Sequence, residues 1–165
     1  MSKRIVIMGV AGCGKSTVGA ALAKALDTTY LDGDDLHPQS NIDKMAAGTP
    51  LEDADRWPWL DDVGAALTSH DGPILIGCSA LKNIYRDRIR AAAGEVFFLH
   101  LHGPRDVIET RMSARAGHFM PTALLDSQFA ALEMLGPEEL GQVVSIDQDI
   151  DGIVRDTLAA LRSPK

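Results

Sequence analysis

One eight-residue stretch constrains the fold of this chain more than any other feature of its sequence. Residues 9–16 read Gly-Val-Ala-Gly-Cys-Gly-Lys-Ser and fit the pattern G-x-x-x-x-G-K-[ST]. The stretch follows an apolar run, Ile5 to Met8, and precedes apolar residues at helical spacing between Val18 and Leu26. A strand, a glycine-rich turn and a helix in this order form a cradle in which backbone N–H groups surround phosphate oxygens. We therefore expect a nucleotide to bind at this turn.

Each residue type in this phosphate loop has a chemical reason. Glycines let the N–H groups turn inward, Lys15 is placed to reach the β- and γ-phosphates, and the Ser16 hydroxyl to coordinate Mg²⁺. For Cys13 two interpretations stay open, a small residue that fills the loop and a thiol made reactive by the helix terminus. Thr17 either joins the site or only packs. The expected nucleotide contacts are Gly9, Gly12, Cys13, Gly14, Lys15, Ser16 and Thr17.

Further apolar runs predict a parallel sheet. They are continuous rather than alternating, as in strands covered on both faces, and helical patterns separate them. The fold class is therefore α/β, with strands at residues 5–8, 30–31, 73–78, 96–101 and 143–146. End signals predict three later helices. They run from Pro104 to Gly117, from Thr122 to Leu135, and over residues 153–161 behind a capping Asp151.

Composition indicates one globular domain over residues 1–165. With 45% apolar residues the chain can bury a core, which excludes long disorder, and a net charge of −7 disfavours nucleic acid as a partner. We interpret the most basic run, residues 82–90, as a solvated helix face. Two cysteines are too few for a disulfide framework, and no apolar run suits a signal peptide or a membrane span. We expect a cytoplasmic protein with no membrane partner.

Residues 32–62 carry nine carboxylates in a stretch that is too long for a tight connection. Insertions between strands commonly hold binding sites, so we expect substrate contacts over residues 35–70. A solvated acidic surface is the alternative for each carboxylate taken alone. We interpret Trp57 and Trp59 as packing residues and Pro58 as the start of a helical turn.

Two carboxylates, Asp32 and Asp34, follow the short strand at Tyr30 and Leu31. They are therefore expected at the carboxyl edge of the sheet, where open α/β folds bind ligands. We assign Asp32 to Mg²⁺ and Asp34 to accepting a proton from, or orienting, an attacking hydroxyl. The reverse order stays open, and so does a simple turn.

Several nucleotide-binding classes are disfavoured. No strand ends in the acidic residue expected of a motor ATPase, and the guanine signature N-K-x-D of GTPases is missing. Arg111 and Arg115 are four residues apart and precede Gly117 and His118, which suggests a lid over residues 111–122. Arginines over a transferring phosphoryl group stabilise its charge, so we interpret both as catalytic, the alternative being an exposed helix face paired with Glu109.

At this point the chain resembles the bacterial gluconokinase family nearly from end to end. The resemblance rests on residues 31–38 (LDGDDLHP), 41–45 (NIDKM), 48–51 (GTPL), 55–60 (DRWPWL), 78–82 (CSALK), 85–86 (YR) and 117–119 (GHF). It implies a P-loop kinase fold with a five-stranded parallel sheet. It also implies ATP-dependent phosphorylation of D-gluconate at its terminal hydroxyl, with Mg²⁺, by a homodimer.

A sugar acid needs a cation for its carboxylate and hydrogen-bonding groups for its hydroxyls. We expect Arg56, with Lys44 or Lys82, to bind the carboxylate, because a guanidinium suits bidentate pairing. The hydroxyl contacts are assigned to His37, Ser79 and His118 in addition to Asp34. Gln148, in the loop after the last strand, is a candidate for the adenine side.

Two other functions stay open. A shikimate kinase of the same fold also carries an aspartate pair, but it has a Gly-Gly-Gly run where this chain has Gly77-Cys78-Ser79-Ala80. A regulatory protein that binds nucleotide without catalysis is the second alternative. Lys15, Asp34 and Arg115, present together, argue against it.

Overall fold

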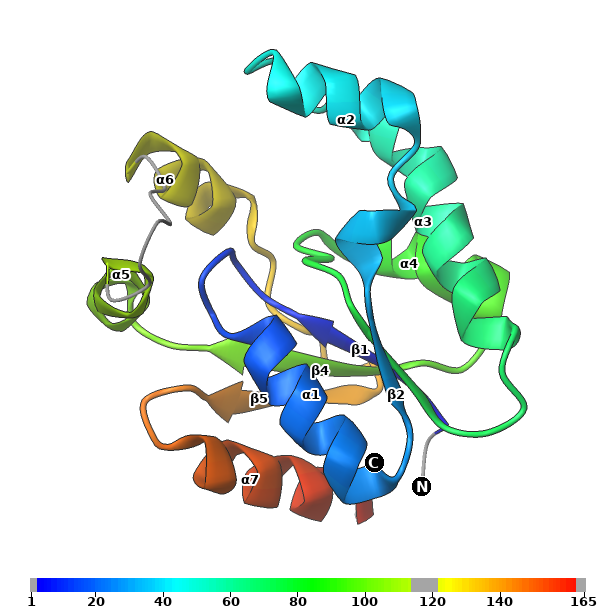
Figure 1. Cartoon of the computed structure of the whole chain (residues 1–165), viewed down its shortest axis with the longest axis vertical. Helices are drawn as coiled ribbons and strands as arrows, with labels where there is room; N and C mark the ends of the chain where they lie inside the picture. The colour runs from blue at the N-terminus through cyan, green and yellow to red at the C-terminus, as the bar shows by residue number, and fades with distance from the viewer. Residues whose placement is uncertain (1–2, 114–121, 163–165) are drawn as a thin grey trace.

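Five parallel strands form one sheet in the order β2-β3-β1-β4-β5 (Figure 1). The computed structural model describes residues 3–113 and 122–162. The strands are β1 (Arg4–Met8), β2 (Thr29–Asp32), β3 (Ile74–Gly77), β4 (Phe97–His102) and β5 (Gly141–Ser145). The predicted α/β class with a five-stranded parallel sheet is confirmed.

Helices cover both faces of the sheet. One face carries α1 (Lys15–Leu26) and α7 (Ile150–Arg162), and the other carries α3 (Asp53–Thr68) and α4 (Asn83–Ala93). The remaining helices are the short 3₁₀ helix η1 (Gly33–Leu36), α2 (Gln39–Ala46), α5 (Arg105–Ser113) and α6 (Thr122–Ala131). In Figure 1, α2 and the start of α3 form an arm that extends beyond the carboxyl end of β2.

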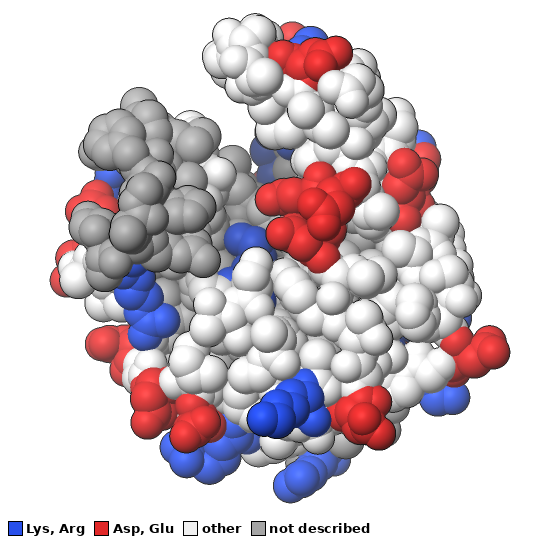
Figure 2. All heavy atoms as spheres, in the orientation of Figure 1, with Lys and Arg blue, Asp and Glu red and all other residues white. Residues whose placement is uncertain are grey.

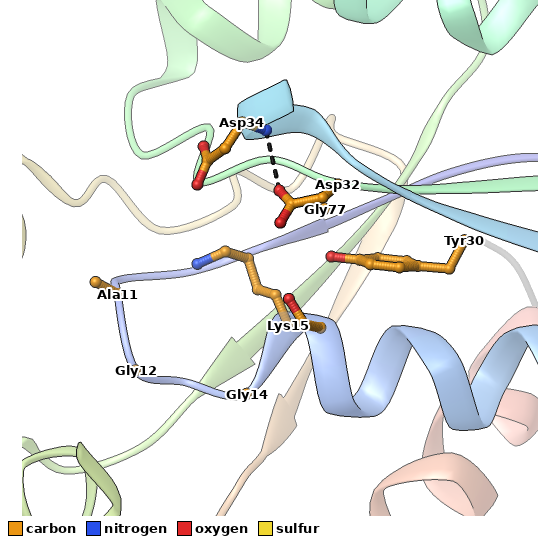
Figure 3. A pocket seen from close by; sticks show the side chains of 9 residues that line it. Ala11, Gly12, Gly14, Lys15, Tyr30, Asp32, Asp34 and Gly77 are labelled. Carbon is orange, nitrogen blue, oxygen red and sulfur yellow. Dashed lines mark hydrogen bonds between the residues drawn. The ribbon is translucent and has the colours of Figure 1, made fainter. Parts of the chain in front are cut away.

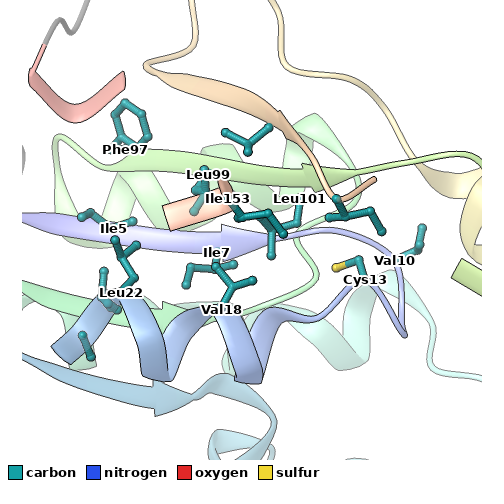
Figure 4. Packing of buried hydrophobic residues seen from close by; sticks show 14 of the residues in the cluster. Ile5, Ile7, Val10, Cys13, Val18, Leu22, Phe97, Leu99, Leu101 and Ile153 are labelled. Atoms are coloured by element: carbon teal, nitrogen blue, oxygen red, sulfur yellow. The ribbon is translucent and has the colours of Figure 1, made fainter. Parts of the chain in front are cut away.

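The central strand β1 supplies side chains to two cores. Because successive residues of a strand point to opposite faces, Ile5 and Ile7 join the core beneath α1 and α7, whereas Val6 and Met8 join the core beneath α3 and α4. Figure 4 shows the first core, in which Val18 of α1 faces Ile7. These four residues of β1 are fully buried. Burial on both faces explains why the strand is continuously apolar.

Two predicted helix boundaries were wrong. Helix α6 ends at Ala131 rather than Leu135, because the N–H of Glu133 donates to the carbonyl of Leu81 at 2.7 Å and leaves the helical path. Helix α7 begins at Ile150, and its cap is Asp149, whose Oδ1 accepts from the N–H of Gly152 at 2.8 Å.

Pro58 does not start a helical turn. It lies inside α3, which begins earlier at a capping box formed by Glu52 and Asp55. The Asp55 carboxylate accepts from the Glu52 N–H at 2.9 Å. The predicted packing role is confirmed for Trp59, which is 3% exposed, while Trp57 is only partly buried.

The interpretation of residues 82–90 as a solvated face was wrong for Arg86. Its side chain is fully buried, and its Nε lies 3.1 Å from the carboxylate of Glu139, which is also buried. Its guanidinium donates in addition to the carbonyls of Ala80 at 2.9 Å and Leu81 at 3.2 Å. This ion pair therefore ties α4 to the turn after β3 and to the segment before β5.

We expect Arg86→Met to lower the free energy of unfolding by about 3–5 kcal/mol, because it leaves the Glu139 carboxylate buried without its main partner. Denaturant unfolding measures the change. The matched control is Arg88→Met, which breaks a half-exposed pair with Asp61 on the same helix and should cost about 1 kcal/mol or less. Equal losses in the two variants would contradict the assignment of a buried ionic tie.

A second buried polar group is His100 on β4. It is fully buried, and neither ring nitrogen has a hydrogen-bond partner within residues 3–113 and 122–162. Burial, together with the nearby His102, Arg86 and Lys15, lowers its pKa to about 4. The ring is therefore neutral in the folded protein at physiological pH.

This histidine makes stability depend on pH. Its folded pKa lies below the unfolded value of 6.5, so the folded state loses stability as pH falls from about 6.5 to about 4, by up to about 3 kcal/mol. We expect His100→Leu to flatten the unfolding free energy over this range, as measured by denaturant melts. His70→Leu, at an exposed site, should leave the slope unchanged. An unaltered slope in His100→Leu would contradict this account.

Candidate active site

The phosphate loop connects β1 to α1 and is held against the sheet at its first glycine. Gly9 has φ +146, and a Cβ there would lie 2.7 Å from the Leu101 carbonyl oxygen, so only glycine fits. The Gly9 N–H donates to the Ser79 carbonyl at 3.2 Å. The loop closes at Gly14, the N-cap of α1. Contacts from β4 and from the turn after β3 therefore fix where the loop begins.

Lys15 lies over this loop. Its Nζ donates to the carbonyls of Gly9 at 3.0 Å and Val10 at 3.2 Å. Lys15 lines a hollow together with Asp34, which faces it from beyond the end of β2 (Figure 3). The residues that line the hollow are Ala11, Gly12, Gly14, Lys15, Ser16, Tyr30, Asp32, Asp34 and Gly77. The structure therefore brings the phosphate loop and the aspartate pair together.

The aspartate pair begins η1. The Asp32 carboxylate accepts from the Asp34 N–H at 3.0 Å and so caps this short helix. From α3, the indole N–H of Trp59 donates to the Gly33 carbonyl at 2.8 Å. The packing of α3 thus holds the turn that carries both carboxylates.

The pKa of Asp34 is raised. Although part of the residue is exposed, burial raises its pKa, the neighbouring Asp32 raises it further, and Lys15 opposes the shift. A raised pKa makes a carboxylate a better proton acceptor. This property suits the role at the acceptor hydroxyl that the sequence analysis assigns to Asp34.

Tyr30 is a pocket residue that the sequence reasoning missed. Its ring lies against Gly19 of α1, and its hydroxyl lies so close to Gly77 that a Cβ at residue 77 would overlap it. Tyr30 and Ser16 line the same hollow, and burial raises the pKa of Tyr30 to about 12. Gly19 and Gly77 both lie against the Tyr30 side chain. These two glycines are the residues in the sequence that could have indicated a large side chain packed between α1 and β3.

Two cations, one from the start of α3 and one from the N-cap of α4, lie over one tyrosine ring of α4. Arg56 lies 5.4 Å and Lys82 lies 5.5 Å from the ring centroid of Tyr85. The Tyr85 hydroxyl donates to Asp53 at 2.5 Å, and Asp53 also pairs with Lys82 at 3.5 Å. Hydrogen bonding from Tyr85, and then the charges of Lys82 and Arg56, lower the pKa of Asp53.

The sequence left Lys44 and Lys82 as alternative partners of Arg56 at the substrate carboxylate. Lys82 shares the Tyr85 ring with Arg56. Lys44 pairs with the capping carboxylate of Asp55 at 2.8 Å and so holds the start of α3. Sequence reasoning gave no role to Asp53.

His37 lies between the arm and the aspartate pair. Its ring stacks on Trp59 with centroids 4.1 Å apart, and its Nδ1 lies 3.1 Å from the side-chain nitrogen of Asn41. Burial lowers its pKa, Arg56 lowers it further, and Asp34 opposes the shift. If the amide of Asn41 donates to Nδ1, the proton is on Nε2, which suits donation to a ligand oxygen.

Arg111 binds the loop after β5 rather than the phosphate loop. Its guanidinium donates to the carbonyl of Ile146, and to that of Gln148 at 3.1 Å. The Gln148 side chain donates to the Ser145 carbonyl and to Asp156, at 2.9 Å each. Both residues therefore shape the predicted adenine loop.

Some of the other predicted site residues lie in or near the phosphate loop, and two lie outside the described residues. Cys13 is buried, with its Sγ 3.9 Å from the Lys15 Nζ, while Thr17 is exposed on α1. Ser79 precedes Ala80, whose φ of +45 is unusual for a residue other than glycine. Arg115 and His118 lie outside the described residues.

The donor set fits Mg²⁺ held jointly with a nucleotide. Within residues 3–113 and 122–162, no group of three or more His, Cys, Asp or Glu side chains could hold a metal alone. Mg²⁺ usually keeps several waters and takes one or two carboxylates plus phosphate oxygens. Ser16 and Asp32 line the same hollow and supply such donors.

Comparisons with known proteins place the chain in a family. A family model described as an AAA domain matches residues 5–135. The thermoresistant gluconokinase of Escherichia coli (strain K12) is 45% identical over 164 residues, which cover 97% of this chain and 94% of that protein. The chain belongs to the gluconokinase family. A crystal structure of a gluconokinase from Sinorhizobium meliloti 1021 matches with a TM-score of 0.88 and 46% identity, over 96% of this chain and 91% of that one.

The shikimate kinase alternative shares only the fold. The structure of shikimate kinase from Aquifex aeolicus VF5 matches with a TM-score of 0.64 at 15% identity, over 96% of each chain. At the end of β3 this member of the gluconokinase family has Gly77 followed by Cys78 and Ser79, in place of the Gly-Gly-Gly run of shikimate kinases. Among the described residues, no helix is both long and apolar enough to span a membrane.

Proposed function

We propose that this chain transfers the γ-phosphoryl group of ATP to the terminal hydroxyl of D-gluconate, giving 6-phospho-D-gluconate. The observation that carries the proposal is a single hollow lined by both Lys15 of the phosphate loop and Asp34. Phosphoryl transfer needs a donor phosphate and an acceptor hydroxyl held in line within one site. Likeness to gluconokinases over nearly the whole chain supports a sugar acid as the acceptor.

ATP occupies the phosphate loop in this proposal. The loop N–H groups and the start of α1 bind the phosphates, and Lys15 exchanges its carbonyl partners for β- and γ-phosphate oxygens. Ser16 and Asp32 would hold Mg²⁺, which when bound neutralises charge on the phosphates. Arg111 and Gln148 shape the loop on the adenine side.

The acceptor hydroxyl lies beside Asp34. As its oxygen bonds to the γ-phosphorus and the bond from that phosphorus to the β–γ bridging oxygen breaks, the hydroxyl proton passes to the Asp34 carboxylate. The raised pKa of Asp34 favours this acceptance. The leaving group is ADP, whose new charge Lys15 stabilises.

The gluconate carboxylate binds the cations around Tyr85. Arg56 and Lys82 share the carboxylate of Asp53, so a second carboxylate can take part of that pairing without leaving a bare charge. Figure 2 shows acidic side chains over η1 at the rim of a hollow, with basic atoms deeper inside. The inner cations attract an anionic substrate once it has entered the hollow, whereas the acidic rim repels it.

The remaining assignments rest on the sequence analysis, and the dimer rests on the family resemblance. We propose that Arg115 stabilises the transferring phosphoryl group, that residues 111–122 form a lid, and that His118, Ser79 and His37 contact hydroxyls. Residues 35–70 form the substrate insertion of a single domain. A cytoplasmic homodimer completes the proposal, and light scattering tests the dimer.

The proposal is tested by a coupled ADP-release assay with gluconate, shikimate and nucleoside monophosphates as acceptors. The expected result is magnesium-dependent ADP release with gluconate and none with the other two acceptors. Turnover with shikimate but not gluconate would reject the proposal in favour of the other kinase. Tight ATP binding without turnover on any sugar acid would favour a regulatory protein.

We expect Asp34→Asn to lower turnover by about 100-fold or more, because the proton acceptor is lost, while ATP affinity changes little. Steady-state kinetics and calorimetric ATP titration measure the two effects. Since the folded pKa of Asp34 is raised, its ionised form costs stability at neutral pH, so the variant should unfold at the same or a higher denaturant concentration. Turnover within a few-fold of the parent would remove Asp34 from the mechanism.

We expect Arg56→Ala to raise the KM for gluconate by about 10-fold or more and to leave the KM for ATP unchanged, because a charged hydrogen bond to the substrate is lost. Lys44→Ala is the matched control, since Lys44 pairs with Asp55 and lies apart from the Tyr85 group. A smaller effect there is expected. The carboxylate assignment fails if the Lys44 variant loses more gluconate affinity than the Arg56 variant.

A further inference from the structure

The tip of the phosphate loop makes a hydrogen bond to a residue outside the motif. The backbone N–H of Ala11 donates to the side-chain oxygen Oε1 of Gln128 at 2.6 Å. The two residues are 117 positions apart in the sequence. The distance is at the short end for an N–H···O bond. A glutamine of α6 thus holds a backbone group of the loop that is expected to bind ATP.

Helix α6 is seated so that Gln128 must face the loop. Leu125 is 2% exposed and belongs to the same buried core as Val10 and Cys13 of the loop. Phe129, four residues after Leu125, packs against this core. Residues three and four positions apart lie on one helix face, so Gln128 shares the face of Leu125. The contact therefore rests on buried packing and not on a freely moving side chain.

Ala11 lies at the part of the loop with few other supports. The base of the loop is held by the Gly9 bond to Ser79 and by the start of α1 at Gly14. Within the motif, the carbonyl of Val10 accepts from the N–H of Cys13 at 3.3 Å and from the Nζ of Lys15 at 3.2 Å. The bond from Gln128 ties the Ala11 N–H to a helix that lies outside the motif.

The chemistry of the side chain also suits this place. A carboxamide oxygen accepts the Ala11 N–H without bringing negative charge to the phosphates. A carboxylate of the same length would accept as well but would repel them. A loop already held in its binding shape loses less conformational freedom when the ligand arrives.

We propose that Gln128 is a positioning residue of the nucleotide site, which fixes the tip of the phosphate loop through the Ala11 N–H and so raises the affinity for ATP. The proposal rests on the proposed function only for the identity of the nucleotide. It assigns to α6 a part in ATP binding that is separate from the gluconate contacts on the arm.

The test compares three variants of the full chain. Gln128→Ala removes the acceptor, and Gln128→Glu keeps an acceptor oxygen and adds a negative charge. Gln142→Ala is the control, because it makes the same glutamine-to-alanine change at an exposed position of β5. Calorimetry measures the Kd for a non-hydrolysable ATP analogue with Mg²⁺. Amide NMR follows the Ala11 N–H, and steady-state kinetics give KM for both substrates.

We expect Gln128→Ala to weaken binding of the analogue by about 3–10-fold, the range of one net hydrogen bond, and to shift the Ala11 amide proton upfield. The KM for ATP should rise by a similar factor, with kcat and the KM for gluconate within twofold of the parent. Gln128→Glu should keep the amide shift. Its affinity relative to the parent should be reduced at low salt and recover as salt is raised, because screening weakens the repulsion. Gln142→Ala should match the parent.

Two results would overturn the proposal. The first is analogue affinity within twofold of the parent in Gln128→Ala. The second is an equal loss of affinity for both substrates with a lowered melting temperature, which indicates a general structural role. If the parent binds the analogue but does not phosphorylate gluconate, the proposed function fails while the binding comparison still decides the role of Gln128.

Discussion

The parallel alignment of the sheet is the constraint on which the site depends. Because β1, β2 and β3 run in the same direction, their carboxyl ends meet at one edge, and the phosphate loop, the aspartate pair and the turn at Ser79 begin there. The loop is bonded to that turn through Gly9, and the Tyr30 side chain of β2 lies against Gly19 of α1 and Gly77 of β3. Any change in strand register would separate the phosphate donor from its acceptor.

Elements far from the edge hold the site by buried polar contacts. The Arg86–Glu139 pair fixes the turn after β3, and the Trp59 indole fixes η1 from beneath the arm. Burying polar groups costs free energy, and removing one partner of a buried pair lowers the stability of the fold strongly. Such contacts therefore favour a single arrangement of the turns that they hold. Gln128 extends the same device to the tip of the phosphate loop.

Features with a local signal were predictable from the sequence, and features made by distant pairing were not. The phosphate loop, the five strands and Asp34 follow from motif, apolar runs and position after a strand. The burial of Arg86 depends on Glu139, 53 residues away, and neither residue carries a local sign of it. Likewise Tyr30 becomes a pocket residue only because glycines of α1 and β3 make room for it. The end of α6 was mispredicted because a bond to Leu81 ends it.

The central claim is that one hollow holds ATP and a sugar acid in line for transfer. The most direct measurement is ³¹P and ¹³C NMR of the product formed from ATP, Mg²⁺ and gluconate labelled with ¹³C at its terminal carbon. The account predicts a phosphate ester whose phosphorus couples to that carbon. Bound nucleotide with no such ester, or an ester on another carbon, would contradict it.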